Sequence, residues 1–130
     1  MKEDFVGYDL AVKLKEKGFP QLEKNTLAMY NEDGEWFSLA KNLDVFEYSF
    51  EDFDDKDCVC PTISQVLKWL REVKRIDAGA VWDNMDGKWI GYINEMDMPD
   101  LVGEYVLPNT YDAYEQAAIA VIEYVIYNLI

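Results

Sequence analysis

Residues 61–93 read PTISQVLKWLREVKRIDAGAVWDNMDGKWIGYI, and they predict a helix followed by a β-hairpin. Thr62 and Gln65 have the spacing of a capping box, in which two side chains bond backbone N–H groups at the start of a helix. The next apolar residues recur every three or four positions, as on one face of an amphipathic helix: Ile63, Val66, Leu67, Leu70 and Val73. The spacing therefore predicts a helix over 63–75. Two β-rich segments, 76–82 and 88–93, are then joined by the turn-forming sequence DNMDG, and Trp82 and Trp89 flank that turn as a cross-strand pair.

The preceding part of the chain repeats this order of a helix and a hairpin. Leu10, Ala11 and Leu14 have helical spacing, and Gly18 supplies a left-handed stop, so a helix is predicted over 8–17. The β-type segments 26–30 and 36–39 surround Asn-Glu-Asp-Gly, a composition typical of a hairpin turn. Residues 43–50 alternate in part between apolar and polar side chains and predict a further strand.

The remaining segments complete an α+β fold. Residues 101–107 predict a strand, and Asp112 and Glu115 open a final helix over 112–128. The expected architecture is an antiparallel sheet built from two hairpins plus one or two strands, packed against three helices in the order α-β-β-α-β-β-α. Helices on both faces of the sheet would make an α/β sandwich, whereas helices on one face would leave a sheet surface for a partner. At 130 residues, the chain is expected to form a single domain, 1–130.

Charge is strongly segregated along the chain. The net charge is −14, and residues 89–130 carry seven acidic side chains and no basic one. Such a surface repels phosphate backbones and anionic lipids, so neither direct nucleic-acid binding nor membrane binding is expected. The acidic residues of two predicted loop regions form a candidate surface for a basic protein partner: Asp52, Asp54, Asp55, Asp57, Glu95, Asp97, Asp100 and Glu104.

The one candidate cationic patch lies on the 63–75 helix, at Lys68, Arg71, Lys74 and Arg75. The spacing of these residues places them on the outer face of an amphipathic helix, near its C-terminus, where positive charge is favourable. We therefore interpret them as a solvated face or as members of intramolecular ion pairs.

The residue types argue against the common catalytic and metal-binding constellations. The chain has no histidine, which is the usual general base near neutral pH and a frequent metal ligand. Cys58 and Cys60 are too close in sequence for an unstrained bridge and too few for a zinc site, so they are expected to be free thiols. The DFDDKD sequence at 52–57 lacks the glycine and the glutamate of a calcium loop. No cofactor, no metal and no catalytic residue are therefore expected.

The chain is expected to be cytoplasmic. Its first residues, MKEDFVGYDL, lack the apolar core of a signal peptide. Its longest apolar stretch, 117–130, is interrupted by Glu123 and Asn128, so no membrane span is expected. Free thiols are also typical of a reducing compartment.

Three segments resemble small uncharacterised proteins encoded by phages and mobile elements of anaerobic gut bacteria. They are PTISQVLKWLREV at 61–73, LKEKGF at 14–19, and YDAYEQAA at 111–118 together with the closing Asn-Leu-Ile at 128–130. The layout is also similar, in architecture only, to the phage α-β-α sandwich domain. The resemblance implies a phage or mobile-element origin and one shared domain, and it brings no catalytic residues.

These observations favour a non-catalytic acidic accessory protein that acts by protein–protein interaction. In a phage context its sharper form is a DNA mimic, whose carboxylates occupy the nucleic-acid groove of a host protein. One alternative is a small enzyme that uses carboxylates, a tyrosine or Cys58. A second alternative is a self-assembling structural component, which would appear as a homo-oligomer.

Overall fold

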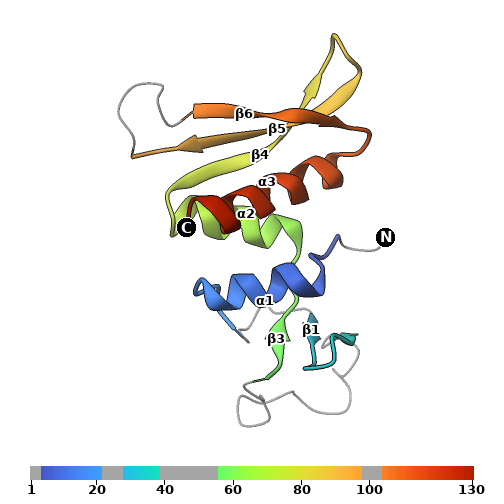
Figure 1. Ribbon diagram of the computed structural model, residues 1–130, viewed down its shortest axis with the longest axis vertical. Helices are drawn as coiled ribbons and strands as arrows, with labels where there is room; N and C mark the ends of the chain where they lie inside the picture. The colour runs from blue at the N-terminus through green and yellow to red at the C-terminus, as the bar shows by residue number, and fades with distance from the viewer. Residues whose placement is uncertain (1–3, 22–27, 39–55, 98–103) are drawn as a thin grey trace. The chain divides into compact units, whose positions relative to one another are not determined.

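A computed structural model describes residues 4–21, 28–38, 56–97 and 104–130. The chain divides at Thr62 into two compact units, Met1–Thr62 and Ile63–Ile130, and each is described by itself (Figure 1). The predicted strand over 43–50 lies outside the described residues. Within the described residues, no helix is long and apolar enough to cross a membrane.

The first unit contains one helix and a small antiparallel sheet. Helix α1 (Tyr8–Glu16) is followed by β1 (Ala28–Tyr30), β2 (Trp36–Ser38) and β3 (Cys58–Val59). The strands are ordered β2-β1-β3, so the first predicted hairpin forms and gains β3 as its third strand. The helix buries Leu10, Ala11 and Leu14, the residues whose spacing predicted it.

Local hydrogen bonds explain where α1 ends and where the chain turns between β1 and β2. Gly18 has φ +95°, and the amide of Phe19 donates to the Leu14 carbonyl at 2.9 Å, which closes α1 as the glycine predicted. At the hairpin, the Asn31 side-chain oxygen accepts the amides of Asp33 and Glu35, each at 2.9 Å. Such side-chain mimicry of a backbone turn is the reason that asparagine favours these positions.

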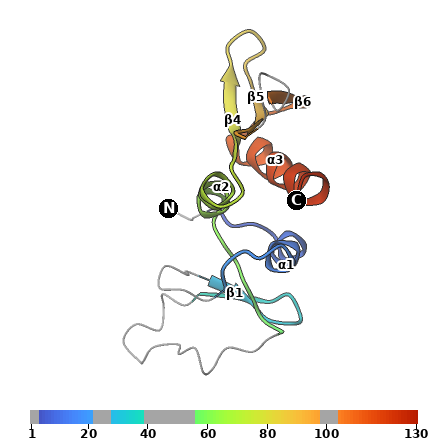
Figure 2. The same cartoon turned by 90° about the vertical axis from the view of Figure 1, so that its left-hand side faces the viewer.

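The second unit contains two helices and a longer antiparallel sheet. Its elements are α2 (Ile63–Glu72), β4 (Ile76–Asp83), β5 (Lys88–Glu95), β6 (Glu104–Tyr111) and α3 (Tyr114–Asn128). The sheet order is β4-β5-β6, and the predicted pair of Trp82 and Trp89 is formed across the second hairpin, with ring centroids 5.4 Å apart. Figures 1 and 2 show both helices of this unit on the same side of its sheet.

The core of the second unit lies between α3 and the sheet. Six α3 residues face it and are buried: Ala117, Ala118, Val121, Ile122, Val125 and Ile126. On the central strand, a Cβ added at Gly91 would overlap the Cγ2 atom of Val121, so the absence of a side chain there lets helix and sheet approach closely. The opposite face of the sheet carries exposed apolar residues, with Val81 at 44% and Val106 at 58% exposure. In this unit, therefore, the helices cover one face.

The α+β class, the two hairpins and the three helices are confirmed, and the sheet differs in one respect. The strands form two three-stranded sheets, one in each unit, instead of one sheet shared by both hairpins. Each hairpin takes its third strand from its own unit, β3 in the first and β6 in the second. That the whole chain forms a single domain stays a prediction.

Three helix boundaries differ from those predicted, and α1 differs least, since it ends at Glu16 and not at residue 17. Helix α2 ends at Glu72, because Arg75 adopts φ +59° and turns the chain into β4. Helix α3 begins at Tyr114, where the Gln116 side chain accepts the amide of Ala113 at 3.2 Å. The carboxylate of Asp112, predicted to open this helix, instead forms an ion pair with Lys88.

Candidate functional site

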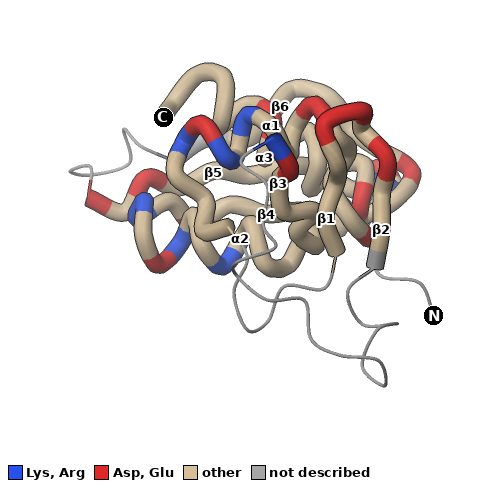
Figure 3. The backbone as a smooth tube through the Cα atoms, turned by 90° about the horizontal axis from the view of Figure 1, so that it is seen from below, with Lys and Arg blue, Asp and Glu red and all other residues tan. Residues whose placement is uncertain are grey.

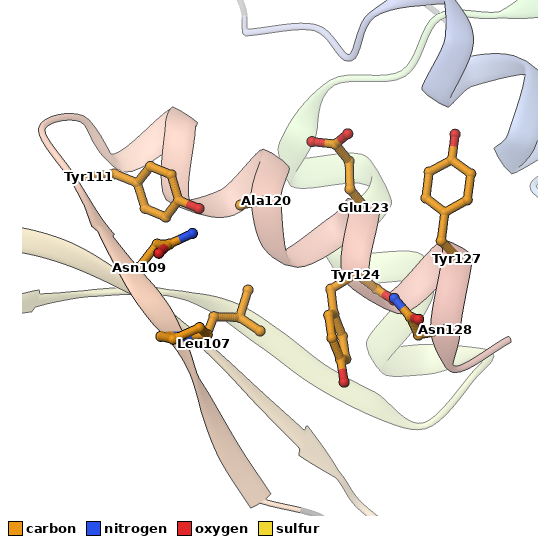
Figure 4. Close-up of a pocket in the computed structure, with 9 residues that line it drawn as sticks. Leu107, Asn109, Tyr111, Ala120, Glu123, Tyr124, Tyr127 and Asn128 are labelled. Atoms are coloured by element: carbon orange, nitrogen blue, oxygen red, sulfur yellow. The ribbon is translucent and has the colours of Figure 1, made fainter.

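A groove between β6 and α3 is the candidate site (Figure 4). Its volume is about 460 Å³, and all of its lining residues belong to the second unit. They are Leu107, Pro108, Asn109 and Tyr111 on β6, and Ala120, Glu123, Tyr124, Tyr127 and Asn128 on α3. A groove of this volume has the size of a small-ligand or side-chain binding site.

The helical wall of the groove follows from the period of α3. Position 120, the pair 123 and 124, and the pair 127 and 128 follow one another at intervals of three or four residues, so they form a stripe beside the one that faces the core. The side-chain amide of Asn128 donates to the Tyr124 backbone carbonyl at 3.0 Å, so this side chain lies against its own helix. Figure 4 shows Glu123 and Tyr127 on one side of this stripe and Tyr124 on the other.

The strand wall follows from an irregularity in β6. Ile90 pairs with Thr110 and Tyr92 pairs with Val106, so three residues of β6 stand opposite Gly91 alone. These three are Leu107, Pro108 and Asn109, and all of them line the groove. A bulge of this kind locally ends regular pairing and redirects side chains, which here gives the groove its strand wall.

The lining chemistry favours a cationic group. Tyr124 and Tyr127 are 38% and 54% exposed, and the Glu123 side chain is also exposed. Aromatic faces attract cations through their quadrupole, and a carboxylate adds charge attraction. None of the nine lining residues is basic, and the chain has no lysine or arginine after Lys88.

Only part of the predicted acidic surface falls within the described residues, so that these side chains form one surface stays a prediction. Asp52, Asp54, Asp55 and Asp100 lie outside those residues, and Asp57 belongs to the first unit, where its carbonyl accepts Lys15 Nζ at 2.7 Å. In the second unit, Glu95 is half-buried opposite Ile76, and Glu104 begins β6 opposite Asn94. Asp97 is exposed and lies 3.4 Å from the Arg75 guanidinium.

The basic residues of α2 and the turn after it occupy the positions expected of a solvated, partly paired helix face. Lys68 and Arg71 are exposed, and Figure 3 colours the charged positions along this helix. Lys74 Nζ lies 5.3 Å from the centre of the Trp69 ring, and Arg75 pairs with Asp97. Two of the four cations therefore have partners within the same unit.

The two thiols lie in the core of the first unit. Cys58 and Cys60 are free and buried, and burial raises the pKa of the Cys58 thiol to about 11. Burial also raises the pKa of Cys60, whose thiol donates weakly to the Val6 carbonyl at 3.5 Å. The Tyr30 hydroxyl donates to the same carbonyl at 2.7 Å, and its pKa is raised by burial and by Cys60. Protonated, buried thiols are poor nucleophiles, which weighs against the alternative of a thiol-using enzyme.

Cys58 is therefore expected to react slowly with iodoacetamide. At about pH 8, a rise of the thiol pKa from 9.0 to about 11 lowers its thiolate fraction about 100-fold. A C60S variant, in which Cys58 is the remaining thiol, should be alkylated at least about 100-fold more slowly when folded than in urea. The rate for the folded chain should rise about tenfold per pH unit towards about pH 11, whereas the unfolded chain should level off above about pH 9. Equal rates for the folded and unfolded chains would contradict this placement of the thiol.

Among the described residues, no three histidine, cysteine, aspartate or glutamate side chains come together as a metal site. A comparison with protein families finds no match to this chain, and comparisons with curated proteins and with solved structures find none either. The resemblance to phage and mobile-element proteins stays a prediction.

Proposed function

We propose that this chain is a non-catalytic binding module, and that the β6–α3 groove holds basic side chains of a partner protein. The observation that carries the proposal is the combination of tyrosines and a glutamate in a groove of about 460 Å³ without a basic lining residue. Positively charged side chains of one partner segment gain from both components, since Glu123 and Tyr127 attract them on one side of the α3 stripe and the Tyr124 ring attracts them on the other.

The surrounding charge supports the same kind of partner. Residues 89–130 contribute seven acidic and no basic side chains to the unit that holds the groove. A field of one sign raises the local concentration of oppositely charged ligands and speeds their association. The partner segment is therefore expected to be rich in lysine or arginine. A phage or mobile-element accessory protein, with its partner in the host cytoplasm, is the setting that the sequence resemblance suggests.

The test is binding of a fluorescein-labelled octalysine peptide, measured by fluorescence anisotropy, with octaglutamate as the negative probe. The double variant Y124A/Y127A is expected to weaken octalysine binding about 5–30-fold, since each exposed cation–aromatic contact contributes about 0.5–1 kcal/mol. The variants Y124F and Y127F retain the rings and should bind nearly as the unchanged chain does.

A matched pair of charge variants separates the groove from general attraction. E123Q and E72Q each remove one exposed negative charge from a helix of the same unit, but only Glu123 lines the groove. E123Q should weaken binding about 2–5-fold more than E72Q does. If both variants weaken binding equally and Y124A/Y127A has no effect, octalysine binds to net charge alone and the proposed function is wrong.

A further inference from the structure

The two edges of the second unit's sheet differ in a way that bears on assembly. The order β4-β5-β6 places β4 and β6 at the edges, and no described strand pairs with the outer side of either. On β6, Pro108 and the irregular register interrupt the edge. Proline and bulges are the devices by which proteins protect an edge strand from pairing with another chain.

Strand β4 has neither of these devices. It pairs with β5 without a break from Ile76 to Asp83, and it contains no proline. Val81 and Trp82, next to one another near its end, point to opposite faces of the sheet and are 44% and 49% exposed. A regular edge with exposed apolar side chains on both faces can accept another strand.

The charges at the two ends of β4 select a second copy of this chain as the occupant. Lys74 and Arg75 directly precede the strand, whereas Asp83 ends it and Asp86 follows in the turn. In a side-by-side pairing of two copies in opposite directions, the basic end of each β4 meets the acidic end of the other. This contact between a basic and an acidic strand end occurs twice in such an interface, because a two-fold axis makes the two copies equivalent.

The register can be stated from the strand itself. A two-fold axis perpendicular to the sheet keeps each face on its own side, so paired residues must belong to the same face. An axis at Gly79 satisfies this condition and sets Arg75 opposite Asp83 and Ile76 opposite Trp82. The Arg75–Asp97 pair does not prevent this, because both side chains are more than half exposed and such pairs are weak.

We infer that two copies of this chain associate through their β4 edges, joining two three-stranded sheets into one antiparallel six-stranded sheet. The interface is separate from the β6–α3 groove, so a dimer would carry two grooves. Binding of octalysine and association of the chain are therefore independent measurements, and failure of one leaves the other standing.

The experiment is sedimentation equilibrium of the full chain over about 10–500 µM in about 150 mM salt, where charges more than about 8 Å apart are largely screened. The mass is expected to rise from monomer to dimer over this range. The charge-reversal variants K74E/R75D and D83K/D86K should each remain monomeric, and an equimolar mixture of the two should recover the dimer mass. Circular dichroism of each variant checks that it is folded.

The control is K68E/R71E, which reverses two charges on α2 and leaves the β4 ends unchanged. This variant should dimerise within about threefold of the unchanged chain, since it alters only distant charges. A monomeric mass for the unchanged chain at about 500 µM would overturn the inference, as would a mixture of the two β4 variants that stays monomeric.

Discussion

Replacement of Gly91 by alanine is expected to lower the free energy of unfolding by about 1–3 kcal/mol. The added Cβ would overlap the Cγ2 atom of Val121 and would lie 3.4 Å from Leu107 Cδ1. Because Val121 is fully buried on α3, the helix must shift or the valine must leave its preferred rotamer. Urea denaturation followed by circular dichroism measures the change.

A double-variant cycle identifies the cause of this loss. The V121A substitution removes the methyl groups that the new Cβ meets, so G91A should cost at least about 1 kcal/mol less in a V121A background. G79A is the matched control on the same sheet, since the atoms nearest to its Cβ would be those of the movable Tyr92 side chain, at 3.2–3.4 Å. An equal cost of G91A with and without Val121 would contradict the close approach of α3 to β5.

Local signals in the sequence predicted the elements of the fold well. Gly18 ends α1 and Asn31 forms the hairpin turn, in each case through hydrogen bonds between residues close in the sequence. Such bonds depend on local sequence alone. The pairing of the strands was harder to predict from the sequence. Strand β3 contains only Cys58 and Val59, too short for any periodic pattern, so its addition to the first hairpin was not predicted.

The candidate site was harder to predict than the fold. Charge counts pointed to a set of acidic residues of which the structure describes only some; among these, Asp57 belongs to the first unit and Asp97 pairs with Arg75. The groove instead depends on the bulge opposite Gly91, which is a property of strand register and leaves no pattern in the sequence. The helical side of the groove, at Glu123, Tyr124 and Tyr127, was not predicted either, although all three residues lie within the helix predicted over 112–128.

Replacement of Ile93 by alanine is expected to cost about 2–5 kcal/mol, the largest effect on stability among these predictions. Ile93 lies on the central strand β5 opposite Ala78, is fully buried, and belongs to the face that α3 covers. Truncation removes apolar contact and leaves a cavity that the sheet closes only in part, because both neighbouring strands hold β5 in place.

Ile90 is the matched control for this prediction, since it is the same residue type on the same strand but belongs to the opposite face and is only half-buried. The I90A variant should cost less than half as much as I93A in urea denaturation, because a partly exposed side chain loses less buried area and leaves no enclosed cavity. If the two costs were equal, α3 would not cover the face that carries Ile93. The groove that depends on this packing would then lose its helical wall, and octalysine binding would be expected to survive Y124A/Y127A.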